Sequence, residues 1–419
     1  MDLRARRFAV SQVLAICLVL GGARTARAQL RPDPEAIKLA PSELVERLRA
    51  NPLDYFRFVN RPWIARVCEV FAQDIPSLPP VRLHGDAHLE QFAVTDDTWG
   101  LDDFDDSARG PALVDMIRFL GSIDLTLRRR EWTRSREPLF DRFFAGYRKG
   151  LAEPDYRPPQ PAVVGRLRAQ APRSRAAYLE WGEAQMQPMS EASLKAVVAG
   201  MDALARVMLV EQPDLPPGYL TVARAGWLRT GVGSAVRAKI LIRVQGPSAD
   251  PEDDELVEAK ELQDLSGLRC LEAPPTVQPT LRVIAGATQV GRLKHNILAA
   301  GPELVIPEVM APGRQLRDWW IRSWEGSYRE LRIDDLRSVQ EMKEIIYDAG
   351  VQLGGGALRE TRTPADRQRQ LASLARMERR IRDEAPRLVD ELLRGWKEFA
   401  ASRAGPVLPP SSTMADWPE

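Results

Sequence analysis

Histidine and aspartate residues gather in one stretch of the chain, residues 81–122, which reads VRLHGDAHLEQFAVTDDTWGLDDFDDSARGPALVDMIRFLGS. Two of the three histidines of the protein, His84 and His88, lie in it on either side of Asp86. A second acidic group follows and consists of Asp102, Asp103, Asp105 and Asp106. This pattern is typical of a metal centre, or of a phosphoryl-transfer site in which one aspartate orients a hydroxyl group and another binds Mg²⁺. The alternative is that His84 and His88 are packing and hydrogen-bonding residues in a turn after a strand.

The segment between the two acidic groups is typical of a β-hairpin. Apolar residues at 92–95 and 99–101 flank Asp96-Asp97-Thr98, and a short strand is expected at 81–83. Such a hairpin would bring both acidic groups to the same side of the structure. Because clustered carboxylates repel one another, we expect cations or basic side chains to lie among them.

A helix is expected directly after the acidic residues. Apolar residues recur at helical spacing between 111 and 127 and give one buried face, formed by Leu113, Met116, Ile117, Leu120 and Ile123. Asp115 lies in the first turn of this helix. The helix therefore places one further carboxylate near the acidic groups.

A second region is typical of a small antiparallel sheet. Strands are expected at 219–222, 235–244 and 256–260, and less clearly from 282–286 to 308–310. A glycine turn, Gly-Val-Gly-Ser at 231–234, follows the first strand, and glycine lets backbone N–H groups approach phosphates closely. Lys260 lies inside the third strand, in a chain with only eight lysines. Each feature alone is more typical of an ordinary turn or a solvated lysine, but together with the acidic groups they favour a phosphate-binding site.

The remaining chain is mostly helical in pattern. Helices are expected at 41–50, within 162–210, at 336–353 before a glycine run at 354–356, and at 364–401. We therefore predict an α+β protein with two lobes. Its expected parts are a mostly helical lobe at 29–212 with the acidic groups, an antiparallel sheet lobe at 213–333 with Lys260, C-terminal helices at 334–403 and a tail at 404–419.

Residues 1–28 have the pattern of a secretory signal peptide. Three arginines precede an apolar run at 8–22, and Ala26-Arg27-Ala28 supplies a cleavage site. We expect export to the periplasm or the medium without stable membrane insertion after cleavage, and an uncleaved N-terminal anchor is the alternative. Export would permit a disulfide between Cys68 and Cys270, with two buried free thiols as the alternative. The formal net charge of +1 offers no basic excess and argues against nucleic acid as a partner.

Several motifs resemble those of DUF2252, a bacterial family of unknown function, over most of the chain after residue 28. They are Pro52-Leu-Asp-Tyr-Phe-Arg57, Gly85-Asp-Ala-His-Leu89, Asp103-Phe-Asp-Asp106 with Gly110-Pro111 and Asp115, Gly231-Val-Gly-Ser234, and Lys260-Glu261. The family is remotely similar to protein kinases and aminoglycoside phosphotransferases. The resemblance therefore implies a two-lobed, kinase-like fold and a phosphotransferase-like activity.

The resemblance also implies a role for each residue. Asp86 would accept or orient the substrate hydroxyl group, and His84 and His88 are the other candidate catalytic residues. His84, together with Asp115 of the following helix, would support the loop. Mg²⁺ would be bound by Asp103 and Asp105, with Gln91 at the position of a metal-binding asparagine. The phosphates of ATP or another nucleotide would be held by Lys260, Gly231, Gly233 and Ser234.

The chain departs from the kinase pattern in three ways. Gln91 is one methylene longer than the asparagine that it replaces, which would change the metal geometry. The catalytic loop precedes the glycine turn and Lys260, so a kinase-like fold requires a permuted order of the lobes. Residues 353–358, LGGGAL, lack the histidine of the corresponding family motif.

Three functions remain open from the sequence. The leading one is an exported Mg²⁺- and nucleotide-dependent phosphotransferase, or a nucleotidyltransferase with the same residues, that acts on the hydroxyl group of an unknown small molecule or protein. The alternative is a non-catalytic, pseudokinase-like protein that binds a ligand, favoured by Gln91 and by the scarcity of nucleoside triphosphates outside the cytoplasm. The third is a metal-dependent hydrolase that uses His84, His88 and the aspartates and needs no role for Lys260.

Overall fold

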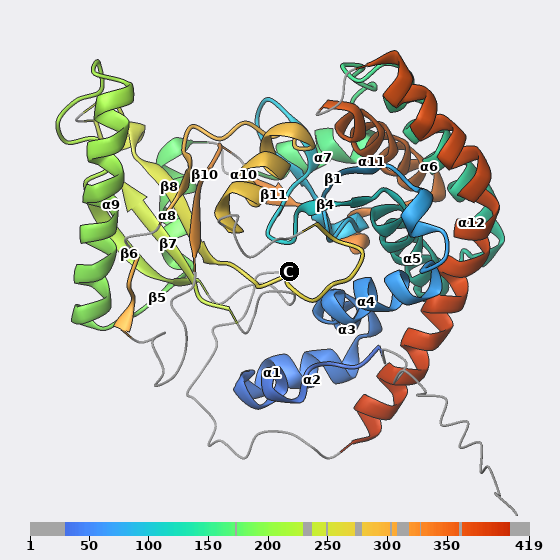
Figure 1. Ribbon diagram of the computed structural model, residues 1–419. Helices are drawn as coiled ribbons and strands as arrows, with labels where there is room; N and C mark the ends of the chain where they lie inside the picture. The colour runs from blue at the N-terminus through green and yellow to red at the C-terminus, as the bar shows by residue number, and fades with distance from the viewer. Residues whose placement is uncertain are drawn as a thin grey trace, which may run out of the picture.

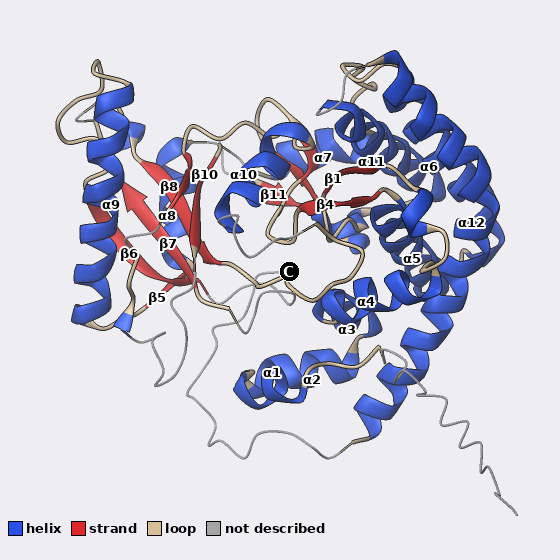
Figure 2. Ribbon diagram, viewed as in Figure 1, coloured by secondary structure: helices blue, strands red, loops and turns tan. Residues whose placement is uncertain are grey.

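The computed structural model has an α+β fold, in agreement with the fold class expected from the sequence (Figure 1). It describes residues 30–171, 174–228, 237–248, 250–272, 279–301, 304–307, 318–326, 328–359 and 363–402. Helices surround two small sheets on one side of the molecule, and a larger sheet forms the other side (Figure 2). The division into lobes at the expected boundaries remains a prediction.

The described helices lie mostly before and after the large sheet in the chain. The first six are α1 (Pro34–Leu39), α2 (Ser42–Ala50), α3 (Pro52–Phe58), α4 (Asn60–Val70), α5 (Leu113–Arg129) and α6 (Arg136–Ala152). The others are α7 (Ala162–Gln170), α8 (Arg175–Ala184), α9 (Glu191–Glu211), α10 (Pro279–Gln289), α11 (Val339–Arg359) and α12 (Pro364–Ala401). The described helices include none that is both long enough and apolar enough to cross a membrane.

The described strands form three antiparallel sheets. Two small sheets carry the acidic groups, and they consist of β1 (Pro80–Leu83) with β4 (Ala108–Pro111), and of β11 (Arg329–Glu330), β2 (Phe92–Val94) and β3 (Trp99–Leu101) in that order. The large sheet has the order β5-β6-β7-β8-β10-β9, with bounds Met186–Gln187, Val222–Leu228, Lys239–Val244, Glu255–Glu261, Trp319–Trp324 and Leu298–Ala300. The expected strand at 81–83 and the expected hairpin at 92–101 are confirmed.

The large sheet has one apolar face and one face rich in charged residues. Alternate residues of a strand point to opposite faces, and on the apolar face they include Ile240, Ile242, Val257, Ala259 and Ile321. Val197 and Met201 of α9 pack against this face, and α9 lies on the outer side of the sheet at the left of Figure 1. The other face, with Lys239 and Lys260, points toward the acidic groups.

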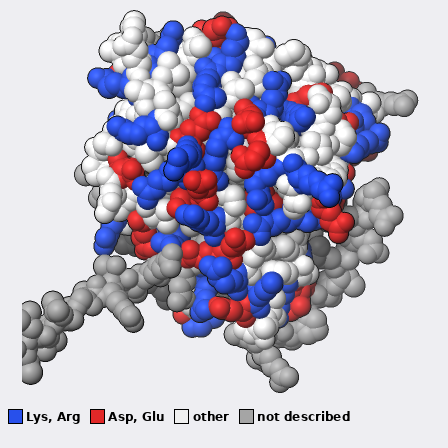
Figure 3. Space-filling model, turned by 90° about the vertical axis from the view of Figure 1, so that its right-hand side faces the viewer, with Lys and Arg blue, Asp and Glu red and all other residues white. Residues whose placement is uncertain are grey.

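The helical side is built around α5, α6, α11 and α12. The expected buried residues of α5, among them Ile117 and Leu120, lie in the largest apolar core. On the outer face shown in Figure 3, Lys and Arg are interspersed with Asp and Glu. Ion pairs such as Arg382–Asp141, 2.7 Å between Nη2 and Oδ1, link α12 to α6. The long helix expected at 364–401 is therefore confirmed as a cover over this core.

The glycine run at 354–356 does not follow α11 but lies inside it. α11 packs along α6 so closely that a Cβ atom on Gly354 would lie 2.2 Å from the carbonyl oxygen of Tyr147. A Cβ atom on Gly146 would lie equally close, 2.2 Å, to the carbonyl oxygen of Tyr347. The glycines thus allow two backbones to touch, and tertiary packing outweighs their poor helix propensity.

Two expected strands are wrong. Residues 282–286 belong to helix α10, because a short apolar run does not distinguish a strand from a buried helix, and the buried Thr280, Val283 and Ala287 recur at helical spacing. Residues 219–220 lie in a turn, and the strand begins only at Val222. The expected strand at 308–310 lies outside the described residues.

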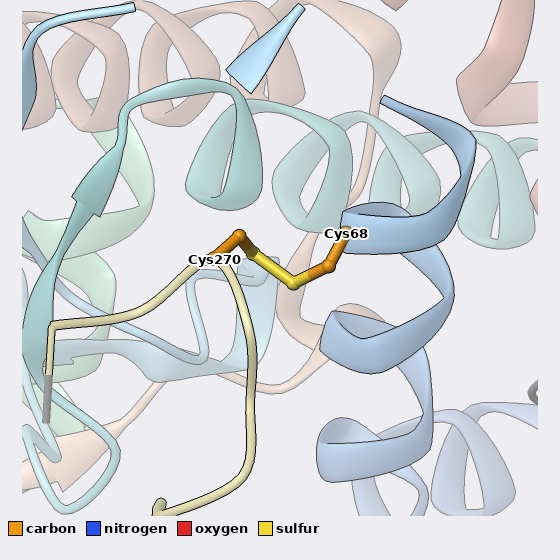
Figure 4. The surroundings of a disulfide bond; sticks show 2 residues. All are labelled: Cys68 and Cys270. Carbon is orange, nitrogen blue, oxygen red and sulfur yellow. A yellow bond between two sulfur atoms is a disulfide. The ribbon is translucent and has the colours of Figure 1, made fainter. Parts of the chain in front are cut away.

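Cys68 and Cys270 form a disulfide, with 5.5 Å between their Cα atoms (Figure 4). The bond joins α4 to the segment that follows β8 and links residues 202 positions apart. Of the two alternatives that the sequence left open for these cysteines, the disulfide is the one in the structure. It fastens the chain after Lys260 to the helix that begins at Asn60.

Candidate functional site

The turn before Asp86 is held by the first turn of α5. The carboxylate of Asp115 accepts hydrogen bonds from the backbone N–H of His84 (2.7 Å) and of Gly85 (2.9 Å). Gly85 has φ +86°, and a Cβ atom there would lie 1.8 Å from the carbonyl oxygen of Asp106. Burial raises the pKa of Asp115, although both backbone hydrogen bonds oppose the rise. The turn therefore needs glycine at 85 and a hydrogen-bond acceptor at 115.

His84 connects the two acidic groups. Its Nδ1 accepts a hydrogen bond from the backbone N–H of Asp86 (3.2 Å), and its Nε2 donates to the carbonyl oxygen of Asp102 (2.8 Å). Since a carbonyl can only accept and a backbone N–H can only donate, the proton of the neutral ring lies on Nε2. Both ring nitrogens therefore bind the backbone and position the loop.

Asp86 is buried beside an arginine that the sequence analysis did not single out. Arg118 of α5 approaches its Oδ1 at 2.8 Å with both Nε and Nη2. The other oxygen, Oδ2, lies 3.4 Å from Gln91 Nε2 and 3.7 Å from His88 Nε2. Burial raises the pKa of Asp86 to about 7, because Arg118 offsets the cost of burial only in part and Asp106 adds repulsion. Burial also holds the pKa of His88 well below its usual range, so His88 is neutral.

The second acidic group meets the large sheet through Lys260. Its Nζ lies 2.6 Å from Asp103 Oδ1, 3.6 Å from Asp105 Oδ2 and 3.7 Å from Glu258 Oε1. Burial alone would raise the pKa of Asp103, but Lys260 and Lys239 hold it well below its usual range. Burial and the neighbouring Asp103 raise the pKa of Asp105 to about 6. Lys260 and Asp103, distant in the chain, thus form one ion pair.

Further basic and aromatic residues complete this part of the site. Arg322 of β10 pairs with Asp102 and, through Nε at 3.0 Å, with Glu258 Oε2. The Tyr328 hydroxyl group donates to Asp102 at 2.7 Å. The indole of Trp320 donates to Asp105 Oδ1 at 2.7 Å, and Arg237 Nη1 lies 3.7 Å from Asp105 Oδ2. The cations that clustered carboxylates require are therefore basic side chains of the protein itself.

Several buried polar atoms around Asp86 have no hydrogen-bond partner among the described residues. Asn60 uses its Nδ2 to bind Gly85 O and Asp106 Oδ2, both at 2.9 Å. The atoms without a partner are Asn60 Oδ1, His88 Nε2, Asp106 Oδ1 and Arg118 Nη1. Buried polar groups are normally paired, so this mixture of donors and acceptors fits water molecules or a polar ligand. Polar groups are thus available around Asp86 for more than packing.

The structure brings most of the expected site residues together. The loop with His84, Asp86, His88 and Gln91 lies on one side, and Asp103, Asp105 and Lys260 lie on the other, joined through His84 and Asp102. Gly231, Gly233 and Ser234 fall within 229–236, outside the described residues. The sequence analysis missed Arg118, Lys239, Glu258 and Arg322. Charged residues inside otherwise apolar strands were the available signal for three of them.

One comparison with known proteins gives a match. Residues 45–175 match the model of a family described as an uncharacterized protein conserved in bacteria (DUF2252). The matched segment contains Asp86, Gln91 and Asp103 and ends before Lys260, so it supports the resemblance found in the sequence over the acidic half of the site. Neither the curated proteins nor the solved structures contain a match.

Proposed function

We propose that the protein is a Mg²⁺-dependent phosphotransferase that moves a phosphoryl group from a nucleotide such as ATP to a substrate hydroxyl group. The observation that carries this proposal is the 2.6 Å contact between Lys260 Nζ and Asp103 Oδ1. In protein kinases a lysine on the third strand holds the phosphates and a separate aspartate holds Mg²⁺. Lys260 lies on β8, the third strand of the consecutive series β6-β7-β8, and the glycine sequence lies between the first two.

The carboxylates beside Lys260 suit Mg²⁺. Carboxylate and amide oxygens are the ligands that this hard cation prefers; Asp103 and Asp105 lie beside Lys260, and Gln91 lies in the loop of Asp86. Among the described residues no three His, Cys, Asp or Glu side chains converge as a metal site. Mg²⁺ needs no such cage, because it is held by one or two carboxylates together with water and substrate phosphates. When bound, it would neutralise the charge of the phosphates, while Lys260 would turn from Asp103 to a phosphate oxygen.

Asp86 is suited to accept a proton from the substrate. A general base works best when its pKa lies near the working pH, and burial places the pKa of Asp86 at about 7. As the hydroxyl oxygen bonds to the phosphorus, its proton would pass to Asp86 and the nucleoside diphosphate would leave. Arg118 orients the carboxylate through Oδ1, and Oδ2, whose hydrogen bond from Gln91 Nε2 is long at 3.4 Å, would accept the proton.

A second candidate is an exported ligand-binding protein without turnover. It is supported by the pairing of each main carboxylate with a basic side chain: Asp86 with Arg118, Asp102 with Arg322 and Asp103 with Lys260. Gln91 also directs its amide nitrogen toward Asp86. The disulfide supports export, since disulfides persist in oxidising compartments, where nucleoside triphosphates are scarce. The hydrolase hypothesis has less support, because both ring nitrogens of His84 bind the backbone.

Calorimetric titration of the full chain with ATP, with and without Mg²⁺, tests the proposal. We expect binding that requires Mg²⁺ and that is lost in Asp103→Asn, a substitution that retains a residue tolerant of the positive φ of +64° at this position. Asp97→Asn, an exposed change in the hairpin turn, is the matched control and should bind as the wild type does. Absence of Mg²⁺-dependent binding would overturn the proposal.

A turnover measurement separates the two candidates. Radiolabelled ATP incubated with the protein in excess reports transfer of the terminal phosphoryl group to water or to added hydroxyl compounds. Transfer of the phosphoryl group that disappears in Asp86→Asn supports the enzyme. Binding of ATP without any transfer would instead favour the ligand-binding protein.

A further inference from the structure

The face of the large sheet that meets the acidic groups is laid out in three rows. Residues directly opposite one another on antiparallel strands point to the same face. The strand register gives a lysine row of Lys239, Lys260 and Trp320, an ion-pair row of Leu241, Glu258 and Arg322, and a third row of Arg243, Leu256 and Trp324. Ligand recognition on this face therefore depends on the charge of each row and on the contacts that its side chains already make.

The lysine row places two like charges side by side in a buried position. Lys239 and Lys260 face each other across β7 and β8, and they are 8% and 2% exposed. Like charges directly opposite are destabilising, and burial together with Lys260 lowers the pKa of Lys239. These are two of only eight lysines among 59 basic residues of the chain. Such a pair costs stability unless negative charge lies nearby, as Asp103 and Asp105 provide here.

The other two rows are occupied. In the ion-pair row, Glu258 Oε2 accepts from Arg322 Nε and from Trp324 Nε1, both at 3.0 Å. In the third row, Leu256 lies so close to α8 that a Cβ atom on Gly182 would be 2.2 Å from it. Arg243 of the same row is fastened to Glu183 of α8 at 2.8 Å.

A nucleobase is normally held in an apolar slot with a few polar groups. Next to the lysine row, the described part of this face offers ion-paired side chains and then the cover of α8. Tyr178 and Leu179 of α8, both buried, fill the space over Leu241 and Leu256. The part of this face that lies beside the acidic groups is therefore the one rich in charge.

We propose that the phosphate donor is recognised through its phosphates, held between Lys239 and Lys260, and that its base contributes little. The inference rests on the proposed function and names its donor class, which is nucleoside triphosphates of any base together with inorganic polyphosphate. An ammonium group acts as a point charge, so each lysine binds whichever phosphate oxygen lies nearest. Lys239 thereby becomes a second phosphate-binding residue.

The test compares three probes on the wild-type chain by calorimetric titration with Mg²⁺: ATP, GTP and inorganic triphosphate. We expect their affinities to agree within about tenfold, since they share the phosphate chain. A preference for one base above that ratio would overturn the inference. This comparison needs no variant, so it stands however the variants behave.

A pair of lysine variants tests the two-lysine clamp, which consists of Lys239 and Lys260. Lys239→Met should weaken the binding of all three probes by about tenfold, the loss expected for one charge-assisted contact. It should fold, which circular dichroism checks, because it relieves repulsion with Lys260. Lys195→Met, which removes an exposed lysine of α9, is the matched control and should change nothing.

The outcomes separate this inference from the proposed function. If Lys239→Met retains wild-type affinity while Asp103→Asn abolishes ATP binding, the two-lysine clamp is wrong and the proposed function stands. If the wild-type chain binds none of the three probes, both are wrong.

Discussion

Asp86 and Asp103 lie in the same cluster, yet their surroundings shift their pKa in opposite directions. Burial raises the pKa of Asp86 to about 7, because Arg118 offsets the cost of burial only in part and Asp106 adds repulsion. Around Asp103, Lys260 and Lys239 outweigh burial and hold the pKa well below its usual range. The balance of neighbouring charges therefore suits one carboxylate to accept a proton and the other to stay ionised beside a cation.

The two regions also differ in how they are built. Asp86 sits in a loop fixed by contacts within residues 60–118, among them Asn60 and Asp115. Asp103 depends on Lys260, 157 residues away in the chain. The first region is thus set by one continuous segment, and the second exists only once the large sheet has docked.

The largest expected effect concerns the proposed role of Asp86 as the proton acceptor. In Asp86→Asn, phosphoryl transfer should fall by about 10²–10⁴-fold, the usual contribution of a general base. The wild-type rate should rise as the pH rises through about 7, because Asp86 accepts a proton only when ionised. Single-turnover assays over a pH series measure both. A flat pH profile, or an unchanged rate in the variant, would contradict the assignment.

The next effect concerns the ion pair of Asp103. Lys260→Met should lower the free energy of unfolding by about 3–5 kcal/mol, because it leaves buried carboxylates without their main counter-charge. Urea denaturation at neutral pH measures it. The exposed Lys195→Met is the control and should change stability by less than about 1 kcal/mol. An equally small change in both variants would show that the buried pair adds little.

The pH dependence of stability should separate the two carboxylates. Asp103 has a lowered folded pKa, so its stabilising contribution is present above its ordinary pKa of 3.8 and is lost as the pH falls through the lower folded value. The raised folded pKa of Asp86 has the opposite effect. Its contribution to stability is fully present below pH 3.8 and is lost as the pH rises through about 7. Denaturation of the wild type, Asp103→Asn and Asp86→Asn across pH should show these opposite slopes. Parallel curves would contradict the comparison.

Removal of the disulfide that joins the two regions should lower the stability by a smaller or similar amount. In the double variant Cys68→Ser with Cys270→Ser, the free energy of unfolding should fall by about 2–5 kcal/mol, because the unfolded chain regains the freedom of a long loop. Denaturation with and without a reducing agent measures it, and the reducing agent should have no effect on the variant. Mg²⁺-dependent ATP binding should persist if the Lys260–Asp103 pair holds the regions together without the cross-link.

The smallest effect tests the backbone at Asp103. Both Asp103→Gly and Asp103→Ala remove the carboxylate, but glycine adopts the observed φ of +64° more readily, so the glycine variant should be more stable by about 1 kcal/mol. At Asp106, which has no positive φ, the order should reverse. Thermal unfolding of the four variants gives the comparison. The same order at both positions would mean that φ is not the cause.

Local patterns predicted much of the framework correctly. The hairpin at 92–101, helix α5, the strand with Lys260 and the long helix α12 follow from alternation, helical spacing and turn residues. The pattern failed at α10 and at the glycine run of α11. In both places packing against a neighbouring element decides the secondary structure, and the local periodicity of the sequence does not record such packing.

By itself the sequence determined which residues are candidates for the proposed chemistry, because carboxylates, a scarce lysine and a glycine-rich segment are visible as residue types. It also predicted the hairpin that joins the two acidic groups. Only the tertiary structure decided that Arg118 pairs with Asp86, that Arg322 pairs with Asp102 and Glu258, and that Lys239 stands opposite Lys260. These pairings join residues on different helices, strands and loops, and pKa values depend on charges a few ångströms away in space, whatever their distance along the chain.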